Sequence, residues 1–188
     1  MGSDLDDLEQ TWRRKHRIGL ETPRFHLRPL IEQDVDWLAD LFADPEVNQF
    51  LWDGAATPQQ ARRGAEAIVQ LDLMRYHFGH WAILDKNDGA IHGWTELSKL
   101  RPWNGPSDEI ALSYVLRRAS WGRGIATEAA GRLLRHAFEA GKLERVMAVI
   151  KDGNAASQRV LEKLGMRFVD SYRSADGSNL RYFRIDAP

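Results

Sequence analysis

The sequence contains no cysteine. This absence excludes disulfide bonds, a thiol nucleophile and any zinc site that is built on thiolates. It also agrees with a reducing compartment, so we expect a cytoplasmic protein. No apolar run approaches the roughly 20 residues that cross a bilayer, and we therefore expect no membrane partner.

An excess of positive charge is also missing. The chain has 26 Lys and Arg against 27 Asp and Glu, which gives a formal net charge of −1. Proteins that bind the DNA backbone usually carry a basic field, so we expect no DNA partner. Internal repeats and low-complexity linkers are absent, and 188 residues with 43% hydrophobic side chains suffice for one domain. We assign this domain to residues 21–188 and treat 1–20 as an N-terminal tail or short helix.

Hydrophobic periodicity predicts a mixed α/β chain. Strands are expected at 24–30, 80–86, 90–97, 109–116, 145–150, 166–174 and 179–186, and helices at 32–44, 58–76, 124–140 and 154–165. The helix at 58 has a start signal, because Thr57 can cap it and Pro58 suits its first turn. This order predicts an α/β fold, of the α+β type, with a mixed sheet of about seven strands and about four helices packed on it.

Two glycines stand one residue apart at the start of the helix near residue 125. Gly122 and Gly124 leave the backbone bare, and the first N–H groups of a helix have no internal partner and attract anions. Arg117, Arg118 and Arg123 add positive charge nearby. A plain flexible helix start explains the glycines equally well. The P-loop and dinucleotide-binding motifs do not fit, because the Lys of the first and the third small residue of the second are missing.

The run 113–128, followed by NAASQRVLEKLGMRF at 154–168, resembles the GNAT acetyltransferases. The resemblance is closest to the branch that acetylates the N-termini of ribosomal proteins. Gly122 and Gly124 match the glycines of the family's Gln/Arg-x-x-Gly-x-Gly/Ala motif, although Ala119 stands at its first position. The second family signature is matched by Asn154, Ser157, Glu162, Lys163 and Gly165.

The resemblance implies a GNAT-like fold in which the central sheet splays open beside the strand 109–116. It also implies acetyl-CoA as co-substrate, with the pantetheine arm in the gap and the pyrophosphate on the glycine loop. The residues implied for the cofactor are Val115, Leu116, Arg117, Trp121, Gly122, Arg123, Gly124, Ile125, Ala126, Asn154 and Ser157. Asn154 is equally suited to an ordinary helix cap.

Acetyl transfer to an amine needs a neutral amine, a polarised thioester carbonyl and a proton for the leaving thiolate. Deprotonation at pH 7 costs about 1 kcal/mol for an α-amino group and about 4–5 kcal/mol for a lysine. An N-terminal acceptor therefore needs only one weakly placed carboxylate. An N–H near Leu116, freed by the splay, is the expected oxyanion donor.

Glu109 is our first candidate for this carboxylate, because it precedes the small residues Ala111 and Ser113 on one strand face. Glu96, on the same strand face as Trp94, is a close second, and Asp176 lies in a turn-rich segment. Many family members use a tyrosine to protonate the thiolate. In this sequence the corresponding position is occupied by Leu161, so the tyrosine is absent.

Ser157 can substitute for this tyrosine, because its hydroxyl can relay a proton, but contact with the cofactor alone is the safer assignment. His77, His80 and His92 have a loosely metal-like spacing, but no cysteine or carboxylate cluster joins them, so we expect no metal.

The expected function is an N-acetyltransferase that acts on an amine-bearing acceptor. A protein or peptide N-terminus is the first choice, and a small-molecule amine such as an antibiotic or polyamine is the second. The departures from the family motifs also permit a non-catalytic acyl-CoA sensor. The sequence does not decide between a monomer and a homodimer.

Overall fold

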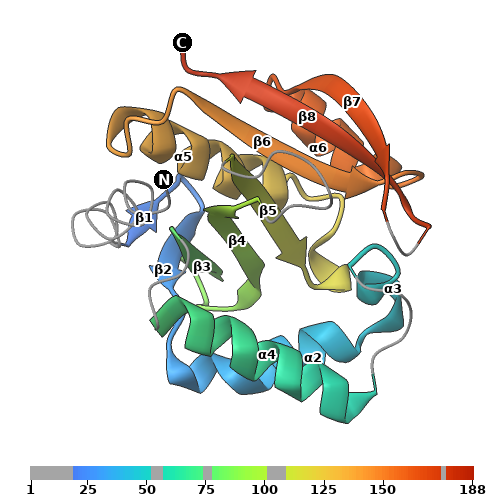
Figure 1. Ribbon diagram of the computed structural model, residues 1–188. Helices are drawn as coiled ribbons and strands as arrows, with labels where there is room; N and C mark the ends of the chain where they lie inside the picture. The colour runs from blue at the N-terminus through green and yellow to red at the C-terminus, as the bar shows by residue number, and fades with distance from the viewer. Residues whose placement is uncertain (1–18, 52–56, 74–77, 101–108, 175–176) are drawn as a thin grey trace.

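Eight strands form one sheet in the order β1-β2-β3-β4-β5-β6-β8-β7 (Figure 1). The computed structural model describes residues 19–51, 57–73, 78–100, 109–174 and 177–188. The strands are Leu20–Glu21 (β1), Phe25–Pro29 (β2), Gly79–Asp85 (β3), Ile91–Lys99 (β4), Ile110–Leu116 (β5), Arg145–Lys151 (β6), Arg167–Arg173 (β7) and Asn179–Asp186 (β8). Only β5 and β6 pair in parallel. The predicted mixed sheet is confirmed, and β1 is the strand that the prediction missed.

The helices lie on both faces of this sheet. They are α2 (Val35–Ala43), α3 (Pro45–Asn48), α4 (Pro58–Leu73), α5 (Ile125–Glu139) and α6 (Ala155–Lys163), with 3-10 turns at Glu32–Asp34 and Arg118–Ser120. Helices α2 and α4 cover one face, and α5 and α6 lie on the other (Figure 1). Among the residues that the structure describes, no helix is both long and apolar enough to span a bilayer.

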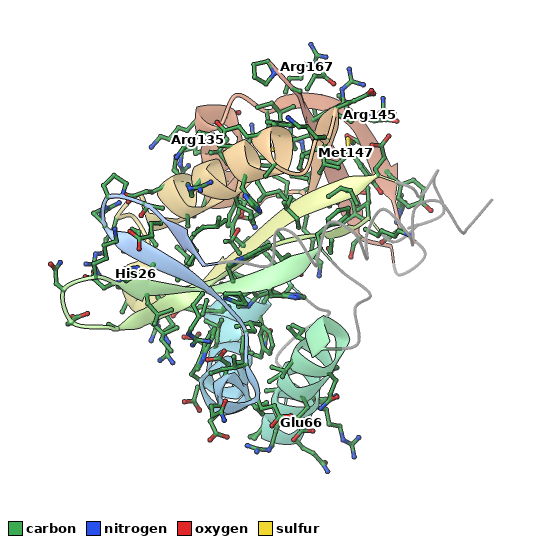
Figure 2. All side chains as sticks on the ribbon, turned by 90° about the vertical axis from the view of Figure 1, so that its left-hand side faces the viewer. His26, Glu66, Arg135, Arg145, Met147 and Arg167 are labelled. Atoms are coloured by element: carbon green, nitrogen blue, oxygen red, sulfur yellow. The ribbon has the colours of Figure 1, made fainter. Side chains whose placement is uncertain are left out.

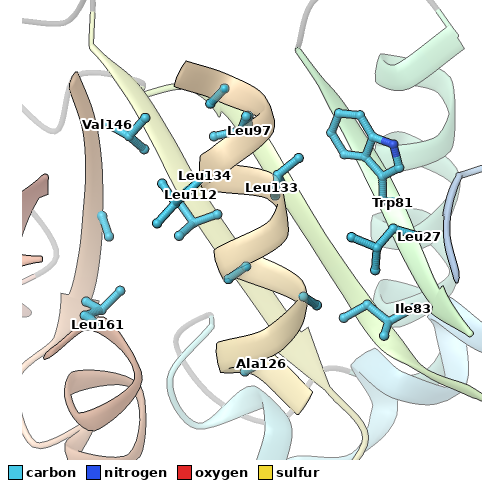
Figure 3. Packing of buried hydrophobic residues seen from close by; sticks show 14 of the residues in the cluster. Leu27, Trp81, Ile83, Leu97, Leu112, Ala126, Leu133, Leu134, Val146 and Leu161 are labelled. Atoms are coloured by element: carbon cyan, nitrogen blue, oxygen red, sulfur yellow. The ribbon is translucent and has the colours of Figure 1, made fainter. Parts of the chain in front are cut away.

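Each face of the sheet has its own hydrophobic core. On the α5 face, Leu133 and Leu134 pack with Leu112 of β5 and Val146 of β6 (Figure 3). On the α2–α4 face, the buried residues include Leu38, Phe42, Ala61, Ala65, Trp94 and Val115. Strand β5 contributes to both cores, because alternate residues point to opposite faces, as predicted. The two cores hold β5 firmly on both sides.

Gly93 lies at a bulge where β4 bends toward the end of β5. Its φ is +148°, and an added Cβ would lie 2.1 Å from the carbonyl oxygen of Val115. The register with β3 shifts here, because Ile83 pairs with Gly93 and Leu84 with Ile91. A glycine inside a strand is typical of such a close backbone approach.

Replacing Gly93 by alanine is expected to destabilise the protein by roughly 2–4 kcal/mol. The new methyl group cannot move away, because the atoms it meets belong to the backbone of β5. Chemical denaturation measures the loss, with Gly19→Ala as the control, since a Cβ there meets its nearest atom only at 3.8 Å. Equal stability of the two variants would contradict this account of the bulge.

Strands β5 and β6 separate soon after they meet. Their pairing consists of one register pair, Ala111 with Met147. On its other side β5 pairs with β4 over its whole length, from Ile110 opposite Lys99 to Leu116 opposite Gly93. The splay that the family resemblance implies is therefore present, and it opens toward the C-terminal end of β5.

Candidate active site

The loop between β5 and α5 presents bare backbone. Gly122 and Gly124 both have φ of +73°, and an added Cβ at Gly122 would meet no atom within 4 Å. Gly124 occupies the N-cap position of α5, and none of the side chains that the structure describes caps this helix. By contrast, the side chains of Asp44, Thr57 and Asn154 cap α3, α4 and α6. The first N–H groups of α5 therefore remain available to an anion.

The residues around the glycines have different partners. The N–H of Arg117 donates to the carbonyl of His92 (2.8 Å), and its Nε is buried without a hydrogen-bond partner among the described residues. Arg118 pairs with Glu46 of α3, so its charge is already compensated. The indole N–H of Trp121 donates to the carbonyl of Leu116 (3.0 Å), while its side chain stays 43% exposed. Of these two arginines, Arg117 has the charge still available to an anion.

A buried histidine, His92, holds this loop against the sheet. The Nδ1 atom of His92 lies 2.9 Å from Oγ of Ser120, and its Nε2 lies 3.4 Å from a carboxylate oxygen of Asp85. His92 and Ser120 are both buried. These contacts join the loop to the hairpin between β3 and β4, so the glycines sit on a fixed support.

Arg24, at the start of β2, clamps the same loop to the first turn of α5. Its Nε donates to Glu128 (2.7 Å), its backbone N–H donates to the other oxygen of that carboxylate (3.0 Å), and one terminal nitrogen donates to the carbonyl of Arg123 (3.1 Å). Burial alone would raise the pKa of Glu128, but hydrogen bonds from Thr22 and Arg24 outweigh it and lower the pKa. Arg24 therefore compensates a charged carboxylate beside the uncapped start of α5.

Replacing Arg24 by glutamine is expected to weaken the binding of CoA by about tenfold, or about 1.4 kcal/mol. The loop loses a charge-assisted anchor, and Glu128 becomes an uncompensated negative charge near the helix start. Calorimetry measures the dissociation constant. Arg62→Gln is the matched control. Arg62, on α4, is also exposed, and it pairs with Asp36 of α2 and Glu66 of α4. Equal affinity of the two variants would contradict this role.

The backbone N–H groups of alternate residues in β5 point toward the gap between β5 and β6. Arg117 donates to β4, and antiparallel pairing alternates, so the N–H groups of Tyr114 and Leu116 point away from β4 toward the gap. The hydroxyl of Tyr114 donates to the carbonyl of Ser157 (3.1 Å), which links β5 to the first turn of α6. Burial raises the pKa of Tyr114, so this phenol stays protonated.

The first turn of α6 agrees with both roles considered for Asn154. Its Oδ1 accepts from the N–H of Ser157 (3.0 Å), which is an ordinary helix cap. The cap also holds Ser157 beside Tyr114 and therefore beside the gap. Leu161, at the position of the family tyrosine, is buried in the core, so this position offers no proton donor.

The three candidate carboxylates have different surroundings. Glu109 precedes β5 and pairs with Arg145 of β6 (3.1 Å), which Figure 2 labels far from Glu66 of α4. Glu96 lies on β4 opposite Ser113 of β5, and one of its oxygens contacts Nε2 of His80. Asp176 lies outside the described residues.

Glu96 belongs to the α2–α4 face of the gap. The side chain is 13% exposed, and its second oxygen accepts from the hydroxyl of Ser98 (3.2 Å). Trp94 lies on the same strand face, with its ring centroid 5.3 Å from that of His80. The indole N–H of Trp94 is buried and has no partner among the described residues. A buried donor of this kind is normally satisfied by water or a ligand.

The histidines do not form a metal site in the described part of the chain. His80 contacts Glu96, His92 contacts Ser120 and Asp85, and His77 lies outside the described residues. No pattern in the sequence pointed to Arg24 or to the pairing of His80 with Glu96, because both depend on how segments far apart in the chain pack together. Gly93 was the one available signal for the bend of β4 toward β5.

Comparison with known proteins agrees with this geometry. The sequence matches the acetyltransferase (GNAT) domain over residues 24–167. An uncharacterized Bacillus subtilis protein, YkkB, is 32% identical over 84% of this chain and 90% of its own length. The FsC-acetyl coenzyme A-N(2)-transacetylase of Aspergillus fumigatus is 26% identical over 84% of this chain and 68% of its own length.

A solved structure gives the same result for the fold. The structure of RimL, a ribosomal L7/L12 alpha-N-protein acetyltransferase in complex with coenzyme A, has a TM-score of 0.73. The likeness covers 90% of this chain and 98% of that chain at 17% identity. The family domain is matched over most of this chain, α5 starts at an uncapped glycine, and a gap opens beside β5. The chain therefore belongs to the GNAT acetyltransferases.

Proposed function

We propose that the protein transfers the acetyl group of acetyl-CoA to the α-amino group of a protein or peptide N-terminus, by direct attack in a ternary complex. The observation that carries the donor half is the uncapped start of α5 next to the gap between β5 and β6. The acceptor half rests on Glu96, a carboxylate that is only 13% exposed and lies on the strand next to β5, and on the fold shared with RimL.

The residues around the gap fit a CoA thioester. The N–H groups of residues 122–126 are proposed to bind the pyrophosphate, with Arg117 and Arg123 adding charge. The backbone of β5 from Tyr114 to Leu116 is proposed to hold the pantetheine arm, with Asn154 and Ser157 on its other side. Trp121 has an exposed ring beside the glycines and is proposed to cover the adenosine. The bound thioester supplies the electrophilic carbonyl carbon.

The two proposed proton transfers take place on opposite faces of the sheet. On the α2–α4 face, Glu96 is proposed to accept the proton of the attacking amine, directly or through one water. The C–N bond forms and the C–S bond breaks, while the N–H of Leu116 stabilises the oxyanion. On the α5–α6 face, the hydroxyl of Ser157 is proposed to relay a proton from water to the departing thiolate, so that the serine itself stays protonated.

The surroundings of the carboxylates favour Glu96 over Glu109 as the base. Glu109 is held in an ion pair with Arg145 (3.1 Å), so its carboxylate already has a partner. Glu96 is only 13% exposed and faces Ser113, on the strand that borders the gap. Cross-strand neighbours lie about 5 Å apart, so Glu96 is one strand away from the gap, and ordered water can connect it to an amine there.

Thiol release from acetyl-CoA tests this proposal. Peptides with a free N-terminal alanine or serine are expected to release thiol, while the same peptides with a blocked N-terminus and a free lysine are not. Release with polyamines alone would replace the protein acceptor by a small-molecule amine. Binding of acetyl-CoA without release for any acceptor would contradict a transferase and indicate an acyl-CoA sensor.

A further inference from the structure

His80 is the immediate neighbour of Glu96 across the β3–β4 pair. The two residues are directly opposite in register, and Nε2 of the imidazole contacts Oε2 of the carboxylate. His80 is only 3% exposed. Its backbone is also fixed, because its carbonyl accepts from the N–H of Leu30 (3.1 Å). The backbone of the histidine is therefore held in the sheet, and its side chain is enclosed.

The remaining contacts of this pair restrict it further. The ring of Trp94 packs edge-on against the imidazole at an interplanar angle of 61°. On the gap side, Glu96 faces Ser113, which belongs to the strand that borders the splay. His80 thus lies behind Glu96 as seen from the gap, in the position of a support.

The charged groups on the same face are bound to other partners. Arg28 of β2 donates to Asp34 (2.8 Å). Arg62 of α4 pairs with Asp36 and Glu66 at the exposed surface. On β5 the side chains that point to this face, Ala111, Ser113 and Val115, do not titrate, and Glu109, which precedes them, pairs with Arg145. His80 is a titratable group in direct contact with Glu96.

We propose that His80 is a positioning residue that holds Glu96 toward the gap by donating its Nε2–H to the carboxylate. This rests on the proposed function, in which Glu96 accepts the proton of the amine. A glutamate side chain has three rotatable bonds and loses considerable freedom when fixed. A donor behind it selects one orientation before the acceptor arrives, and it stabilises the charge of a buried carboxylate.

Two replacements of His80 separate this role from a purely structural one. Glutamine places an amide N–H near the position of Nε2, so His80→Gln is expected to keep kcat within about threefold and to leave the pH profile of kcat/KM unmoved. Phenylalanine keeps the ring against Trp94 but has no donor. His80→Phe is expected to lower kcat about 30- to 100-fold and to move the acid limb of the profile to higher pH, because a buried carboxylate without a donor is protonated more easily.

The affinity for acetyl-CoA, measured by calorimetry, is expected to stay unchanged in both variants. If His80→Phe fails to fold, His80→Asn replaces it, because its shorter amide reaches only the Nδ1 position. A wild-type pH profile and kcat in the variant without a donor would overturn the proposal. So would a glutamine variant as slow as phenylalanine, since the imidazole itself would then carry the proton. Absence of transfer in the wild-type protein would instead overturn the proposed function.

Discussion

Replacing Gly122 by aspartate is expected to weaken CoA binding at least about a thousandfold, which corresponds to about 4 kcal/mol. The Cβ direction at this residue is open, so the new carboxylate would occupy the space in front of the α5 start. It would repel the pyrophosphate and satisfy the N–H groups that the anion needs. Calorimetry with CoA measures the effect without any acceptor.

Backbone strain must be separated from this effect. A non-glycine residue at a left-handed φ costs about 1–2 kcal/mol wherever it occurs. Gly89, in the β3–β4 hairpin, has the same φ of +73° and the same open Cβ direction, so Gly89→Asp is the matched control. This control is expected to lose stability but to keep its affinity for CoA. If Gly122→Asp and Gly89→Asp bound CoA with similar affinity, this result would contradict an anion site in the loop before α5.

The glycine loop and the helix after it could be predicted from the sequence, because their signals are local. The apolar stripe of α5, the glycines before it and the alternation along β5 all lie within one short run. The structure places each of these features as predicted. The prediction of Thr57 as the cap of α4 is also confirmed, since Thr57 and Gln60 satisfy each other's backbone N–H groups.

The support of the site could not be predicted, because it depends on pairs far apart in the chain. Arg24 meets Glu128 across 104 residues, and His92 meets Ser120 across 28. Each is an ordinary residue in its own segment, and only the strand order brings the members together. The same reason explains why Glu109 was the first candidate for the base in the sequence. Its local pattern with Ala111 and Ser113 is visible in the sequence, whereas its partner Arg145 becomes visible only once β6 is placed beside β5.

The position of β5 explains how one strand serves both halves of the proposed reaction. One of its edges pairs fully with β4, which carries Glu96, and its other edge is free beyond Ala111. The free edge offers backbone N–H groups to the donor, and the paired edge fixes the distance from the donor to the carboxylate. The bulge at Gly93 lies opposite Leu116, at the end of β5 where the gap is open.

Replacing Glu96 by glutamine is expected to lower kcat about 100- to 1000-fold with peptide acceptors, while the dissociation constant of acetyl-CoA stays unchanged. Glutamine keeps the size of the side chain but cannot accept a proton, and a general base contributes about this factor. Glu109→Gln is the matched control on the neighbouring strand and is expected to lower kcat less than about threefold, because Glu109 is held by Arg145. Turnover with peptide and acetyl-CoA, measured by thiol release at saturating donor, decides between the two carboxylates. The opposite ranking of the variants would return the role of base to Glu109 and leave Glu96 as a buried partner of His80 that stabilises the sheet.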